Sequence, residues 1–169
     1  MTGVQTCALP IYISVVIPTH NPHAGRLRRT LAALRVQTLA NATWETILID
    51  NASQSALVPD DFAAYAPPNL RVVREPQLGL TAARRRGFTE ARGDFIVMVD
   101  DDNELASDYL AEVRRLFAVY TRIGAFGGKN RPEFETQPPV WMREFDSLIA
   151  CRDLGEAELI AHELWNADL

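Results

Sequence analysis

Cysteine is scarce in this sequence: Cys7 and Cys151 are the only two in 169 residues, and neither lies in a CxxC or Cys/His pattern. This excludes a disulfide framework and argues against structural zinc. The sequence also lacks a run of about 20 apolar residues, which a membrane helix needs, and a basic N-terminal region typical of a signal peptide. These absences indicate a cytoplasmic protein, with any membrane association supplied by regions outside this sequence.

Basic residues are outnumbered by acidic ones, 17 to 22, which gives a formal net charge of -5. This balance argues against a nucleic-acid partner or an anionic-membrane binder. All basic residues except Lys129 are arginine, which we interpret as coding bias. With 47% hydrophobic and 23% charged residues, the composition is typical of a globular domain long enough to bury a core.

The two ends of the sequence look unlike the rest. Residues 1–11, MTGVQTCALPI, show no helical or strand period and resemble a translated sequencing-adapter remnant, so we predict a non-native or disordered leader there. The final residues, HELWNADL, stop without a helix stop signal. We therefore expect a gene fragment, with a core over 12–128 and an incomplete region over 129–169.

Strand and helix patterns alternate along the core. Continuous β-branched runs predict buried strands, and apolar residues at helical spacing predict helices. The expected strands are 12–18, 44–50, 70–74, 94–100 and, as a fifth, 123–126; the expected helices are 24–38, 60–65, 80–92, with Gly93 as its stop, and 107–120. Residues 130–139 read as a loop and 141–169 as a peripheral helix. This alternation predicts a doubly wound α/β sheet.

Polar groups follow four of the predicted strands. In an open parallel sheet, ligands bind beyond the carboxyl ends of the strands. The groups at these ends are Thr19–Asn21, Asp50–Asn51, Glu75–Thr81 and Asp100–Asn103. We expect them to share one edge of the sheet.

The three adjacent aspartates Asp100, Asp101 and Asp102 are the sharpest signal. Adjacent carboxylates repel one another unless solvent or a cation takes up their charge. Their oxygens suit Mg2+ or Mn2+ and leave coordination positions for substrate phosphates. The alternative is a solvated acidic turn before the next helix.

Arginines 84–86 carry positive charge, opposite to that of the three aspartates. Arginine suits phosphate, but successive helical residues point about 100° apart, so we expect one to face a ligand and the others to be solvated or paired with acids. Asp50 is a candidate nucleoside reader, and its alternative is an Asx turn with Ser53. His20 we interpret as a polar loop residue.

These motifs together resemble the nucleotide-binding half of a family 2 glycosyltransferase. The matching segments are Pro18–Asn21, Leu48–Ser53, Gly79–Gly87 and Gly93–Asn103. The resemblance implies a Rossmann-like GT-A fold, with a mostly parallel central sheet, helices on both faces and a C-terminal truncation. The sequence departs from the family at His20, where Tyr is common, and at Arg85, where Asn is common.

The resemblance also implies a donor site. Its expected members are Thr19 and Asn21 in the nucleoside pocket, Asp50 at the base, Arg84 near the base or diphosphate, Asp100 and Asp101 at the nucleotide sugar, with Asp101 near the ribose, and Asp102 on Mn2+ or Mg2+ between the phosphates. The implied reaction is metal-dependent, inverting transfer of a sugar from a nucleotide-diphospho-sugar to a hydroxyl of a saccharide, lipid or protein acceptor.

Such a reaction needs a carboxylate general base. Glu133, Glu135, Asp146 and Asp153 are candidates only by default, so the base stays unassigned and we expect little activity from this chain alone. A non-catalytic nucleotide-binding module is the main alternative. A pyrophosphorylase would carry a Gly-rich phosphate loop, which PTHNPHAG does not match, and a receiver domain would need a different placement of its acids and lysine.

Overall fold

A computed structural model describes residues 12–134, 136–148, 153, 155 and 157–159. The predicted leader, residues 1–11, lies outside this set. The chain divides into two compact units, one ending at Thr121 and the other starting at Arg122, and each is described by itself. Among the described residues, no helix has the length and apolarity to cross a membrane.

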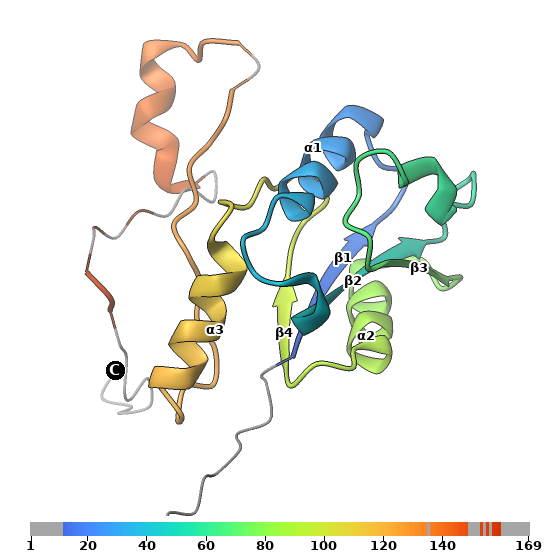
Figure 1. The fold of residues 1–169 in the computed structure, drawn as a ribbon. Helices are drawn as coiled ribbons and strands as arrows, with labels where there is room; N and C mark the ends of the chain where they lie inside the picture. The colour runs from blue at the N-terminus through green and yellow to red at the C-terminus, as the bar shows by residue number, and fades with distance from the viewer. Residues whose placement is uncertain (1–11, 135, 149–152, 154, 156, 160–169) are drawn as a thin grey trace, which may run out of the picture. The chain divides into compact units, whose positions relative to one another are not determined.

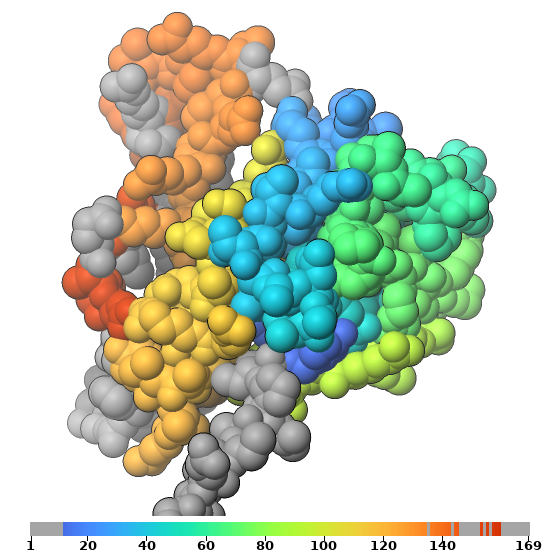
Figure 2. Space-filling view, viewed as in Figure 1, coloured from blue at the N-terminus to red at the C-terminus, as the bar shows by residue number. Residues whose placement is uncertain are grey.

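The first unit is built on a four-stranded parallel sheet in the order β3-β2-β1-β4 (Figure 1). The strands are β1 (Ile13–Thr19), β2 (Trp44–Asn51), β3 (Leu70–Glu75) and β4 (Phe95–Met98). Every residue of β1 and β2 is buried, which agrees with their continuous apolar runs. The space-filling view shows β1 largely enclosed by later segments (Figure 2).

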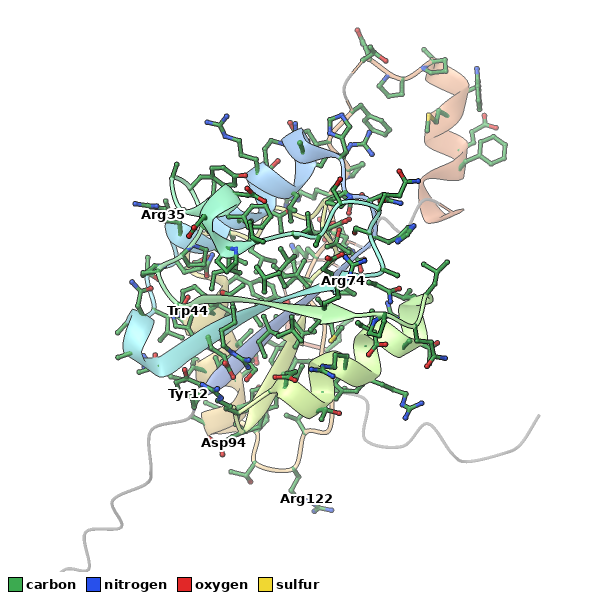
Figure 3. All side chains as sticks on the ribbon, turned by 90° about the vertical axis from the view of Figure 1, so that its right-hand side faces the viewer. Tyr12, Arg35, Trp44, Arg74, Asp94 and Arg122 are labelled. Atoms are coloured by element: carbon green, nitrogen blue, oxygen red, sulfur yellow. The ribbon has the colours of Figure 1, made fainter. Side chains whose placement is uncertain are left out.

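Helices cover both faces of this sheet. Figures 1 and 3 show α1 (Ala24–Arg35) and α2 (Leu80–Glu90) on opposite faces, and α2 packs on β1 and β2. A third helix, α3 (Tyr109–Val119), contacts β4, where Phe117 stacks on Phe95 with ring centroids 3.5 Å apart. The predicted α/β sheet with helices on both faces is therefore confirmed.

Two glycines allow close packing around α2. A Cβ on Gly87 would lie 2.3 Å from Val16 Cγ1, so only glycine lets the helix approach β1 this closely. Gly93 has a different role from the predicted helix stop, because α2 ends at Glu90 with Ala91 as its C-cap. A Cβ on Gly93 would lie 2.6 Å from the backbone nitrogen of Ser14, so this glycine serves the contact with β1.

A polar cluster closes the sheet at the end where β1 and β2 begin. Glu45 accepts hydrogen bonds from Ser14 Oγ at 2.8 Å, from the Arg92 backbone N–H at 2.9 Å and from Arg71 Nε at 3.1 Å. Arg71 also bonds to Glu90, the last residue of α2, at 3.2 Å. The cluster therefore fastens the end of α2 to three strands.

Several predicted elements differ from the structure. The expected strand over 123–126 is wrong: these residues pair with no described strand, because a four-residue run containing Gly124 and followed by Gly127 has little to bury. The helix expected over 60–65 is a short 3-10 turn, η2 (Pro59–Phe62), and another, η1 (Asn41–Thr43), precedes β2.

The second unit contains a 3-10 helix, η3 (Val140–Leu148), at the start of the helix expected over 141–169. The later described positions 153, 155 and 157–159 are not helical, so that expectation is wrong there. Within η3, Trp141 and Phe145 pack edge to face, with ring centroids 6.0 Å apart.

Candidate functional site

The strand-end groups gather where the parallel strands finish. Thr19 lies opposite Asp50 in the sheet register, and Asp50 lies opposite Arg74. In Figure 3, Tyr12 and Trp44 mark the starting ends of β1 and β2, and Arg74 lies toward the opposite edge. Because the chain reverses its direction of winding between β1 and β4, this edge is the place where an open α/β sheet receives ligands.

Asp101, the middle aspartate of the acidic turn, is hydrogen-bonded to β1 and α1. Thr19 Oγ1 donates a hydrogen bond to Asp101 Oδ2, and Thr30 Oγ1 donates one to the Asp101 carbonyl at 3.1 Å. Thr30 is fully buried on α1 and Thr19 is the last residue of β1. These contacts fix the turn that follows β4 against β1 and α1.

Asp100 and Asp102, on either side, are exposed. Within the described part of the chain, neither carboxylate has a hydrogen-bond or ion-pair partner. Across all the residues that the structure describes, no cluster of three or more His, Cys, Asp or Glu side chains is placed to hold a metal ion. Mg2+ usually takes one or two carboxylates and completes its shell with water and substrate phosphates, so the Asp100 and Asp102 oxygens have the chemistry that such a cation would need.

Asp50 lies behind this edge, with no exposed surface. Its Oδ1 accepts from the Ser53 backbone N–H at 3.1 Å, and its Oδ2 accepts from the Leu57 N–H at 3.1 Å and from Arg74 Nη1 at 2.6 Å. Burial raises the pKa of this carboxyl, but the hydrogen bonds, led by Ser53, outweigh burial and hold the pKa below its ordinary value. The contact with Ser53 is that of the Asx-turn alternative, and the role of Asp50 at a base stays a prediction.

Arg74 is a member of this edge that sequence reasoning missed. Besides Asp50, its guanidinium bonds the Ser53 carbonyl at 2.8 Å, and its side chain is 44% exposed. A cation near the end of one strand, beside a strand that ends on an acid, is the signal that would have found it.

The sequence indicates Asn51 only as a neighbour of Asp50 at the end of the second strand. Its Oδ1 accepts from the Gly79 N–H at 2.8 Å, and its Nδ2 donates to the Gln77 carbonyl at 2.6 Å. Gly79 is the N-cap of α2, with φ at 133°, so the buried Asn51 side chain sets where this helix begins.

The arginines of α2 differ from one another. Arg86 pairs with Glu90 at 2.8 Å, and Arg84 and Arg85 are exposed. Arg84 and Arg85 have no acidic partner among the described residues. Two exposed cations in the middle of α2 thus carry a charge that no acidic side chain of the described residues neutralises.

Asn21 connects the first two loops. Its backbone N–H donates to Ser53 Oγ at 2.9 Å, and its Oδ1 accepts from the Gln54 N–H at 2.8 Å. The predicted site residues Thr19, Asn21, Asp50 and Asp101 are therefore joined through the loops after β1, β2 and β4. The structure shows no described contact that brings Arg84 into this network.

This fold belongs to a known class of proteins. The sequence matches the profile of glycosyl transferase family 2 over residues 14–161, and the chain belongs to that family. The O-antigen biosynthesis protein RfbC of Myxococcus xanthus is 34% identical over 108 residues, which cover 62% of this chain and 8% of RfbC. The succinoglycan biosynthesis protein ExoW of Rhizobium meliloti is 32% identical over 103 residues, which cover 58% of this chain and 31% of ExoW. The chain spans less than a third of these curated relatives.

Solved structures share the fold. S. aureus TarS, residues 1–349, in complex with UDP-GlcNAc, superposes with a TM-score of 0.58 and 19% identity, over 73% of this chain and 37% of that one. The same residues of TarS in complex with UDP give the same score. The predicted GT-A fold is confirmed.

Proposed function

We propose that this chain forms the donor-binding part of a metal-dependent, inverting glycosyltransferase. The observation that carries the proposal is the exposed pair Asp100 and Asp102, which have no side-chain partner among the described residues and flank Asp101, whose side chain bonds to Thr19 at the end of β1. Family membership supports a transferase, and the UDP-GlcNAc complex of TarS supports a nucleotide-diphospho-sugar donor.

In this proposal the predicted site residues contact different parts of the nucleotide-diphospho-sugar. Asp102 would hold Mn2+ or Mg2+, and Asp100 and Asp101 would contact the nucleotide sugar, with Asp101 near the ribose. Thr19 and Asn21 line the nucleoside pocket, with Asp50 at the base, and Arg84 approaches the base or diphosphate. A divalent cation bound there would supply Lewis-acid stabilisation of the diphosphate leaving group.

The acceptor half of the reaction needs a general base. Among the candidates, Glu133 is exposed and Asp153 pairs with Lys129 at 3.3 Å; Glu135 and the Asp146 side chain lie outside the described set. We propose that the chain alone binds donor with little turnover, which an assay for UDP release from UDP-GlcNAc checks. The names of RfbC and ExoW support a growing polysaccharide as acceptor.

Calorimetric titration with UDP, GDP and dTDP, in Mn2+ and in EDTA, tests the proposal. We expect one nucleotide to bind in Mn2+ and lose at least about tenfold in affinity with EDTA or with Asp102→Asn, since a metal ligand is lost. The matched control is Asp60→Asn, at an exposed aspartate of η2. Metal-independent binding that survives Asp102→Asn would favour a non-catalytic nucleotide-binding module.

A further inference from the structure

His20 follows directly after β1 and contacts both the last residue of β2 and its own chain neighbour, Asn21. Its Nδ1 lies 2.7 Å from the Asn51 carbonyl oxygen, and its Nε2 lies 2.9 Å from Asn21 Nδ2. The imidazole is exposed, so burial does not explain its position.

The hydrogen-bond partners of the two ring nitrogens indicate which nitrogen carries the hydrogen. A carbonyl oxygen only accepts, so Nδ1 carries a hydrogen and donates it to Asn51. The Asn21 Oδ1 already accepts from the Gln54 N–H at 2.8 Å, so the amide presents its NH2 group to the ring. That group only donates, so Nε2 carries no hydrogen. Both contacts therefore require the neutral Nδ1–H tautomer.

The two contacts connect the loops of the donor site. Asn51 holds Gln77 and Gly79 at the start of α2, and Asn21 holds Ser53 and Gln54 after β2. Through Asn51 and Asn21 the ring is thus connected to the loops that follow β1, β2 and β3.

The backbone beside the ring needs such support. Asn21 and Ala52 have φ values of 46° and 53°, in the left-handed region that non-glycine residues seldom adopt. Conformations of this kind persist only where surrounding contacts fix them. Asn21 bonds to the ring directly, and Ala52 follows the carbonyl to which the ring donates.

We propose that His20 is a positioning residue of the donor site, whose neutral Nδ1–H ring holds these three loops in the arrangement that receives the nucleotide. The proposal rests on the proposed function. The ring acts through its neighbours: without it the loops must be ordered by the ligand, and the cost of that ordering weakens binding.

Substitutions separate the two hydrogen bonds. The amide of His20→Asn keeps a donor near the Nδ1 position, and that of His20→Gln offers an acceptor near the Nε2 position. In Mn2+, we expect UDP affinity to fall about tenfold in His20→Ala and about threefold in each amide variant, from the net worth of one or two hydrogen bonds. The matched control is His23→Gln, at an exposed residue whose side chain makes no cap hydrogen bond.

Affinity of His20→Ala within about twofold of wild type would overturn the proposal. So would amide variants that bind no better than His20→Ala, because hydrogen bonding would then not be the cause. Circular dichroism of each variant verifies that it is folded.

Nitrogen-15 NMR of the imidazole gives a readout without ligand. We expect ring signals of an Nδ1–H tautomer, assigned by their loss in His20→Asn, and an Nε2–H tautomer would overturn the proposal. If wild type binds no nucleotide although the ring is Nδ1–H, the proposed function fails and the positioning role fails with it. If wild type binds and the tautomer is wrong, only the role of His20 fails.

Discussion

Two buried carboxylates lie at opposite ends of β2 and show how this core holds charge. Glu45 is 3% exposed and Asp50 has no exposed surface. Burial raises the pKa of Glu45, but hydrogen bonds, led by the one from Ser14, outweigh it, and the pKa lies below its ordinary value. A pKa lower in the folded than in the unfolded state means that the ionised carboxylate stabilises the fold above the unfolded pKa, about 4.3. This stability is lost as the pH falls through the folded pKa.

Glu45→Gln is therefore expected to lower the free energy of unfolding by about 2 kcal/mol at neutral pH, because a buried acceptor of three donors loses its charge. The difference from wild type should shrink as the pH falls below about 4. Urea denaturation at both pH values measures it, with the exposed Glu144→Gln as control. Equal stability of wild type and variant at neutral pH would contradict this account. UDP affinity should not change, since Glu45 lies at the opposite end of β2 from the proposed donor site.

At the scale of elements, the fit of α2 on β1 depends on Gly87. Gly87→Ala should destabilise the fold by about 2 kcal/mol, because the new Cβ overlaps Val16 and forces the helix outward. Thermal and chemical denaturation measure the loss. Gly25→Ala in α1 is the control, because its Cβ would meet only the exposed ring of His23, at 3.3 Å, and should change stability little. Similar effects of the two variants would show that helix propensity, and not the contact with β1, governs the result.

The elements also show what could be predicted from sequence. The strand predicted over 12–18 corresponds to β1, Ile13–Thr19, with bounds displaced by one residue. It could be predicted because a continuous apolar, β-branched run is typical of a buried strand. The prediction of a strand over 123–126 was wrong because a short apolar segment does not indicate which strand it would pair with. The strand-end rule found the acidic turn. It could not find the contacts of Arg74 and Asn51, which depend on strand register and on side-chain conformation.

At the scale of the whole molecule, the boundary between Thr121 and Arg122 separates two units. Limited trypsin digestion should cut first after exposed arginines of the second unit, such as Arg122 and Arg131, and leave a resistant piece that ends near residue 122. Mass spectrometry of the early products identifies the sites. Early cleavage after Arg71 or Arg86, inside the first unit, would contradict this division.

The strand order also sets a sequence of events during synthesis. β1 meets β2 through residues such as Ser14 and Glu45, 31 positions apart, but the contact of Thr19 with Asp101 spans 82 positions. Of the four strands β1 is synthesised first, so it is open along one edge until β4 arrives, and an open apolar edge invites pairing with other chains. The arrival of β4 closes this edge and delivers the acidic turn to Thr19 in the same step. A nascent chain therefore converts β1 from an edge strand into a central strand at the moment when it completes the contact between Thr19 and the acidic turn.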